Sequence, residues 1–79
     1  MREVVAYLAR ALVDDPDRVT VTEFRGSRGV TYEVRAAPGD VGKLIGRSGR
    51  TVKALRRVVR SVAPRGEGHV EVEVLAEDE

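Results

Sequence analysis

Apolar and polar residues alternate one by one in the segments that we predict to be strands. Residues 30–36, VTYEVRA, alternate strictly, which is the period-two pattern of a strand with one buried face. Residues 69–75 alternate valine with glutamate, and residues 18–24 are rich in β-branched side chains. These patterns predict three strands. The side chains expected to face the core are those of Val30, Tyr32, Val34, Ala36, Val70, Val72 and Val74.

Two other segments carry apolar residues at helical spacing. Residues 2–13 and residues 50–63 each predict an amphipathic helix. The first should end before Pro16, because a proline disfavours helical backbone at the preceding residue. Its predicted apolar stripe is Val4, Val5, Leu8 and Leu12. The predicted stripe of the second helix is Val52, Leu55, Val59 and Val62, opposite Arg50, Lys53, Arg56, Arg57 and Arg60.

A short third helix is predicted over residues 41–45, with Asp40 as its N-cap and Gly46 as its end. The sequence holds two G-x-x-G units, at residues 26–29 and 46–49. The first lies between two period-two segments, so it is expected to be only the turn of a β-hairpin. The second lies between two helices, where a simple corner would need one glycine rather than two.

The order of these segments predicts an α+β fold. The sequence gives helix, strand, strand, short helix, G-x-x-G, long helix and strand, which suits a three-stranded sheet with helices packed on one face. We expect the 79 residues to form one domain, 1–79, with an acidic tail at residues 76–79.

Charge is distributed unevenly along the chain, although the net charge is only +1. Residues 41–66 contain eight Lys or Arg and no acid, whereas the rest carries six basic and thirteen acidic residues. This asymmetry indicates a polyanionic partner. The absence of cysteine excludes disulfides and thiolate metal ligands. Because neither a membrane-spanning apolar run nor a signal-peptide pattern is present, we expect a cytoplasmic protein.

The second G-x-x-G unit combines three features of a phosphate-binding site. Its glycines leave the backbone bare on both sides of Arg47 and Ser48, and the long helix begins just after Gly49. A helix N-terminus presents unpaired N–H groups and a positive dipole end to an anion. The cations Lys43, Arg47, Arg50 and Lys53 surround this corner. We therefore expect it to clamp a phosphodiester backbone.

These residues resemble a known RNA-binding family. The stretch LIGRSGRTVKAL, residues 44–55, is similar to the signature of the KH domain: an aliphatic pair, G-x-x-G, and a basic helix with aliphatic residues at the positions of Val52 and Leu55. KH domains clamp about four nucleotides of single strand with this loop. The extra helix and strand before the core unit match the type II KH fold, and the resemblance covers the whole chain.

The resemblance carries expectations about the site and its partners. The RNA groove would run between the two helices that flank the G-x-x-G unit and a strand edge with the loop PRGEG. Leu44, Ile45 and Val52 are candidates for its apolar floor, although each is also a candidate for the core alone. The resemblance to the small stand-alone bacterial members of this family implies that the chain is an RNA chaperone or post-transcriptional regulator. It also implies that the chain pairs with a larger KH protein and influences cell-wall synthesis and cell shape. The predicted RNA-binding residues are Lys43, Ile45, Gly46, Arg47, Ser48, Gly49, Arg50, Val52, Lys53 and Arg57.

Other functions are disfavoured or stay open. No nucleophile–base pair suggests an enzyme, and no cofactor, metal or small-molecule substrate is expected; the single His69 begins a strand. The segment around Gly42-Lys43 is not a phosphate-binding loop of the Walker type, because Ala37 and Leu44 replace required residues. With only Tyr7, Phe24 and Tyr32 as aromatics, no stacking platform is expected. Two alternatives remain: an assembly module, as a homodimer or a heterodimer that binds RNA only as a complex, and a binder of single-stranded DNA.

Overall fold

The computed structural model describes residues 1–77 as one mixed α+β unit. The elements follow in the order predicted from the sequence, α-β-β-α-α-β. Three single-turn 3₁₀ helices lie between them, at Pro16–Arg18, Pro38–Asp40 and Arg47–Gly49. The main elements are α1 (Arg2–Leu12), β1 (Thr20–Gly26), β2 (Gly29–Ala36), α2 (Val41–Ile45), α3 (Arg50–Val62) and β3 (His69–Ala76).

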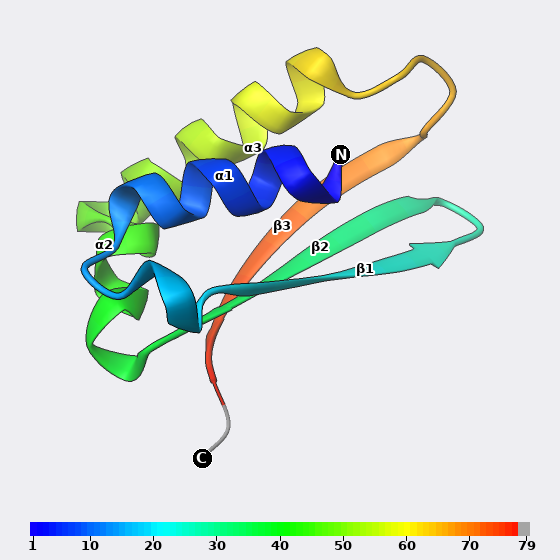
Figure 1. Ribbon diagram of the computed structural model, residues 1–79. Helices are drawn as coiled ribbons and strands as arrows, with labels where there is room; N and C mark the ends of the chain where they lie inside the picture. Colours follow the sequence, from blue (N-terminus) through cyan, green and yellow to red (C-terminus); the bar gives the residue numbers. More distant parts are fainter. Residues whose placement is uncertain (78–79) are drawn as a thin grey trace.

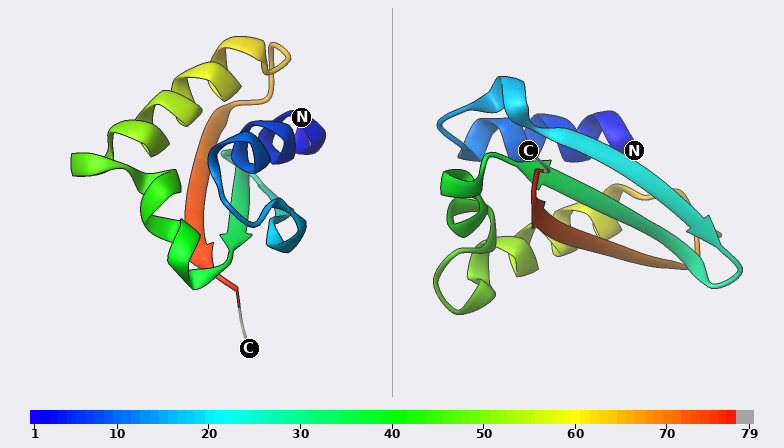
Figure 2. Two further views of the ribbon diagram at one scale, coloured as in Figure 1. Left: turned by 60° about the vertical axis from the view of Figure 1, so that its left-hand side comes forward. Right: turned by 90° about the horizontal axis from the view of Figure 1, so that it is seen from below.

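The sheet has β2 at its centre. β1 pairs with β2 antiparallel, and β3 pairs with β2 parallel. The alternation of residues 30–36 is confirmed, because Val30, Tyr32, Val34 and Ala36 are all buried. Helices α1 and α3 lie over the same face of the three strands (Figure 1). The view from below in Figure 2 shows the opposite face, over which no helix of residues 1–77 passes.

Each long helix buries a slightly different stripe from the predicted one. In α1 the buried residues are Val5, Ala6 and Ala9, whereas Val4 and Leu12 are exposed. Two of the three buried positions of α1 are thus small alanines, and the larger Val4 and Leu12 lie at its exposed flanks. In α3, Val52, Leu55 and Val59 are buried as predicted, but Val62 is 53% exposed. Ala63 packs against the core in its place, because a period of 3.6 residues allows either position after Val59.

Asp40 precedes α2 as predicted but does not cap it. No side chain caps the start of α2. The buried Asp40 carboxylate instead accepts hydrogen bonds from the backbone N–H groups of Asp14 (3.2 Å) and Asp15 (3.0 Å). Burial raises the pKa of Asp40, but these two N–H donors and Lys43 outweigh it, so the pKa lies below its ordinary value. Asp40 thus ties the end of α1 to the start of α2.

The G-x-x-G unit at residues 26–29 is a hairpin turn, as expected. Gly26 pairs with Gly29 at the end of the β1–β2 ladder. Gly29 has a φ of 154°, and a Cβ there would collide with the backbone carbonyl of His69. Glycine is therefore required at this position by the close approach of β3.

The C-terminal strand is one residue longer than predicted. β3 includes Ala76, and the N–H of Glu77 donates to the carbonyl of Ala36 at 2.8 Å. The Glu77 carboxylate also accepts a hydrogen bond from Arg18. The predicted acidic tail therefore begins as part of the sheet, and its residues 78–79 lie outside the described residues.

Candidate nucleic-acid interface

The corner between α2 and α3 is made of left-handed backbone. Gly46 ends α2 with a φ of 75°, and its N–H donates to the carbonyl of Gly42 at 2.8 Å. Ser48 (φ 56°) and Gly49 (φ 74°) follow, and α3 begins at Arg50. Ser48 is the only non-glycine residue with positive φ in the described chain. This run of conformations turns the chain sharply and leaves Arg47 and Ser48 exposed.

The two glycines of this G-x-x-G corner, residues 46–49, face different surroundings. A Cβ on Gly46 would lie 2.8 Å from the backbone N of Thr51, so the first glycine lets the corner pack onto the start of α3. A Cβ on Gly49 would have 3.8 Å to the nearest side-chain atom, Cε of Lys53. No side chain caps the start of α3. The N–H groups of Gly49 and Arg50 donate to the carbonyls of Gly46 and Arg47, so only the N–H groups that follow them in the first turn are left for an anion beside Lys53.

Four of the predicted cations surround this corner without acidic partners. Arg47, Arg50, Lys53 and Arg57 are exposed, and within residues 1–77 none of them forms an ion pair. The last three follow one another at spacings of three and four, so they share one side of α3. Arg50, Lys53 and Arg57 therefore form a row of cations that leads from the start of α3 along one side of the helix.

The other two arginines of α3 have a structural role, which the sequence analysis did not distinguish from the role of the three cations in that row. Arg56 Nε donates to the carbonyl of Val72 at 3.2 Å, and Arg60 Nε donates to that of Val70 at 2.8 Å. Both also pair with Glu71. Burial raises the pKa of Glu71, but the hydrogen bond from His69 and the charges of the two arginines outweigh it and lower the pKa. The glutamates of β3 were the sequence feature that could have predicted ion pairs for some of the α3 arginines.

Lys43 lies in a different setting from the other predicted cations. Its Nζ is 2.6 Å from a carboxylate oxygen of Asp14 and 3.4 Å from one of Asp40. The hydrogen bond to Asp14 is the largest cause of a raised pKa at Lys43, with a further contribution from Asp40. A phosphate that binds Lys43 must compete with two carboxylates.

The three candidates for an apolar floor differ in exposure. Leu44 is fully buried in the core, and Val52 is only 8% exposed. Ile45, directly before Gly46, is 37% exposed. The structure therefore offers Ile45 as the accessible apolar side chain at the corner.

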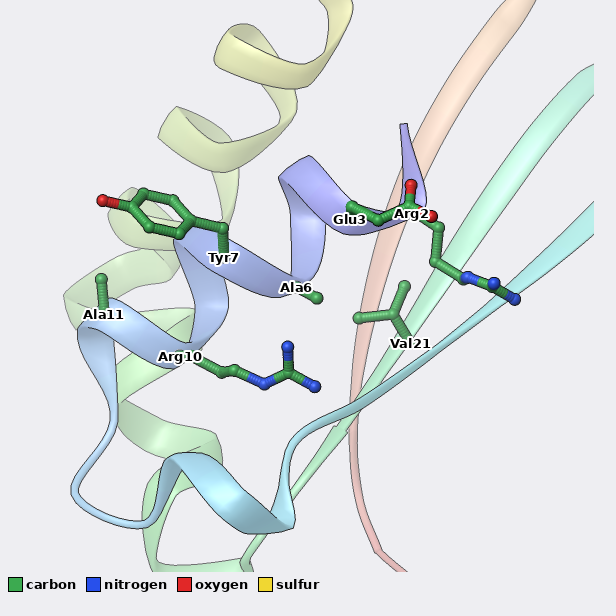
Figure 3. Close-up of a pocket in the computed structure, with 7 residues that line it drawn as sticks. All are labelled: Arg2, Glu3, Ala6, Tyr7, Arg10, Ala11 and Val21. Atoms are coloured by element: carbon green, nitrogen blue, oxygen red, sulfur yellow. The ribbon is translucent and has the colours of Figure 1, made fainter.

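Two surface grooves lie on either side of α1. The α1–β1 groove, of about 650 Å³, has Arg2, Tyr7, Arg10 and Val21 among its lining residues (Figure 3). Arg10 extends across it and donates to the carbonyl of Val19 at 3.3 Å. The α1–α3 groove, of about 300 Å³, is mainly apolar and its lining residues are Leu8, Leu12, Arg50, Thr51, Ala54, Leu55 and Val58.

The described residues contain neither a candidate metal centre nor a candidate membrane span. Within residues 1–77 no three or more His, Cys, Asp or Glu side chains gather closely enough to hold a metal ion. Within the same residues no helix combines the length and the apolar character needed to cross a bilayer.

Comparison with known proteins finds one family that matches nearly the whole chain. The family model for the KhpA/KhpB KH domain matches residues 2–74. A protein named RNA-binding protein KhpA from Chlamydia trachomatis is 43% identical over 77 residues, which cover 98% of this chain and 99% of the relative. Proteins of the same name from Caldanaerobacter subterraneus (41% over 75 residues, covering 95% and 100%) and Streptomyces coelicolor (46% over 66 residues, covering 84% of each) are also similar.

Proposed function

This chain belongs to the KhpA/KhpB KH-domain family, and we propose that it binds single-stranded RNA at its G-x-x-G corner. The observation that carries the proposal is the corner itself: left-handed backbone at Gly46, Ser48 and Gly49, directly before the uncapped start of α3. The relatives named RNA-binding protein KhpA support RNA as the ligand. Single-stranded DNA is the other ligand with the same phosphate chemistry, and the 2′-hydroxyl is what can distinguish the two.

In the proposed complex the strand backbone lies across the corner. The bare backbone around Gly49 allows a phosphate to approach the N–H groups that follow Arg50 in the first turn of α3. Arg47, Arg50, Lys53 and Arg57 neutralise the phosphates on either side, because they have no competing acidic partner within residues 1–77. An unstacked base can contact the exposed side chain of Ile45, and Gly46 and Val52 shape the floor beside it. Lys43 can bind a phosphate only if its ion pairs with Asp14 and Asp40 break.

Phosphate contacts carry no base information, so we propose weak sequence preference. The finer cellular role is also a proposal and rests on the family resemblance. It is that of a cytoplasmic RNA chaperone or post-transcriptional regulator, which pairs with a KhpB-type KH protein and affects cell-wall synthesis and cell shape.

The experiment that tests the RNA clamp measures affinity for a short RNA against salt concentration. With three or four phosphate contacts, log K should fall with log salt at a slope of about −2 to −3, since each contact on a single strand contributes about 0.7. Arg47→Asp with Ser48→Asp should abolish this binding, because two carboxylates would face the phosphates. Aspartate tolerates left-handed backbone better than most residues, so the variant should still fold.

The matched control is the other G-x-x-G unit. On an RNA of about four nucleotides, which fills only the clamp, Ser27→Asp with Arg28→Asp should keep most of the affinity. A flat salt response of the wild-type protein, or an equal loss from both double variants, would contradict the proposal.

A second function, assembly with another KH chain, is favoured by the α1–α3 groove. Val58, at 44% exposed, lies in this groove on α3, and Leu12, at 42%, lies across from it on α1. Apolar side chains on two neighbouring helices suit a symmetric interface in which the same face of a second copy, or of a KhpB-type partner, covers them. Ile45 and Val52 are less accessible for such an interface, because they are 37% and 8% exposed.

A further inference from the structure

The hairpin turn and the connection before β3 lie together at one end of the sheet. The N–H of His69 donates to the carbonyl of Arg28 at 2.9 Å, and Gly68 approaches that carbonyl so closely that a Cβ would lie 2.7 Å from it. Figure 1 shows both loops at the end where β3 begins, beyond the last turn of α3. The hairpin turn, explained above as a turn only, is thus one half of a two-loop surface.

The acidic residues of this surface are already paired, whereas two arginines are not. Arg25 hydrogen-bonds to Glu67 (2.8 Å) and to Glu23, and these bonds raise the pKa of its guanidinium above the ordinary value. Arg28 and Arg65 are exposed and form no ion pair within residues 1–77. The two loops therefore present two free positive charges.

Bare backbone lies next to these charges. A Cβ added to Gly26 or to Gly66 would meet no atom within 4 Å, so an incoming group can approach the main chain at either glycine. Arg28, Arg65, Gly26 and Gly66 line one cleft of about 410 Å³ between the loops. Free guanidinium groups beside open backbone suit a phosphate.

An exposed aromatic side chain stands beside the same turn. Phe24 is 53% exposed and pairs with Thr31, so it lies on the face of the sheet that no described helix covers. Gly29 pairs with His69, so β3 begins directly beside the hairpin turn. Phe24, Arg28 and His69 line one cleft of about 400 Å³. A single exposed ring is not the multi-residue stacking platform that the sequence analysis found lacking, but it can stack one base.

We propose that Phe24, Arg28, Arg65 and His69 form a second nucleotide-binding site, the distal patch. An unpaired base stacks on Phe24 beside His69, and Arg28 and Arg65 bind the adjoining phosphates. This inference rests on the proposed RNA binding and extends its footprint. The 13 residues of α3 separate the corner from the distal patch by about 20 Å, so only an RNA longer than the clamp requires can occupy both.

The test compares oligouridines of about four and about twelve nucleotides, the range of site sizes for small single-strand binders. A longer RNA offers the clamp more positions at which to bind, which alone raises its apparent affinity. The wild-type protein should bind the longer RNA more tightly than this statistical factor explains. Phe24→Ala should weaken binding of the longer RNA by about fivefold or more, which corresponds to the loss of one stacked base. Arg28→Gln with Arg65→Gln should reduce the magnitude of its salt slope by about 1.4, because each phosphate contact contributes about 0.7. Neither change should alter binding of the shorter RNA.

Matched control variants come from the α1–β1 groove. Tyr7→Ala removes an exposed ring, and Arg2→Gln with Arg10→Gln removes the same charge as the distal pair, from residues that line the α1–β1 groove (Figure 3). Both should keep the length-dependent gain. If the wild-type protein binds neither RNA, the proposed function itself fails. If it binds both and the distal variants keep the gain, or if the control variants lose it equally, only the distal patch is overturned.

Discussion

The two glycines of the G-x-x-G corner look equivalent in sequence but meet different constraints. Both have positive φ, which a side chain adopts at a cost of about 1–2 kcal/mol. Only Gly46 is also short of space, because Thr51 lies against it. The first glycine is thus needed for folding, whereas the bare side of Gly49 faces the proposed phosphate.

Alanine substitution should separate these two roles. Gly46→Ala should lower the free energy of unfolding by about 2 kcal/mol or more, because backbone strain and overlap with Thr51 add together. Gly49→Ala should cost only the strain, about 1–2 kcal/mol. Urea denaturation measures both values.

The control for this comparison is Gly49→Asn, because asparagine tolerates left-handed backbone. It should be more stable than Gly49→Ala and still bind RNA less tightly than the wild-type protein, since its side chain occupies the path of the phosphate. Equal destabilisation by Gly46→Ala and Gly49→Ala would contradict the role assigned to Thr51.

At the scale of one element, α3 carries two sets of cations with different tasks. Arg56 and Arg60 are hydrogen-bonded to backbone carbonyls of β3, whereas Arg50, Lys53 and Arg57 form no ion pair within residues 1–77. A helical pattern alone cannot divide them, because all five lie opposite the apolar stripe. The two sets differ because β3 lies beside α3 and its carbonyls are within reach of Arg56 and Arg60 only.

Single substitutions at neighbouring arginines should show opposite effects. Arg56→Gln should cost about 1 kcal/mol of stability, the contribution of a typical hydrogen bond, and leave RNA affinity nearly unchanged. Arg57→Gln should change stability by less than about 0.5 kcal/mol but weaken RNA binding for all sequences alike. Thermal unfolding and RNA titration of the same two variants decide the point. Weaker RNA binding in Arg56→Gln alone would reverse the assignment.

At the scale of the whole molecule, the elements could be predicted better than their contacts. The strict alternation of residues 30–36 placed β2 and its buried face correctly, because one period determines which side chains share a face. Pairings between distant residues could not be predicted in this way. Asp40 binds backbone groups 25 and 26 residues away, and Lys43 is held by Asp14 from the same connection. A local pattern contains no information about which segments meet.

The exposed apolar side chains of the α1–α3 groove bear on assembly, which is a property of the whole molecule. Val58→Glu should convert an assembled form into a monomer while the domain stays folded, because the side chain is half exposed and lies in the α1–α3 groove. Tyr7→Glu, a similar change on the other side of α1, should keep the assembled mass. Sedimentation over a range of protein concentrations measures both. A wild-type protein that stays monomeric throughout would contradict the assembly proposal.

Arg56 and Arg60 have a consequence for how this sheet behaves when the protein is crowded. β3 lies at one edge of the sheet, and an edge with free carbonyls is a template on which a strand of another molecule can add. The two guanidinium groups occupy the carbonyls of Val70 and Val72, so they block this growth. Chains that lack both arginines should therefore fail first by edge-to-edge aggregation, at concentrations where the native protein stays dispersed.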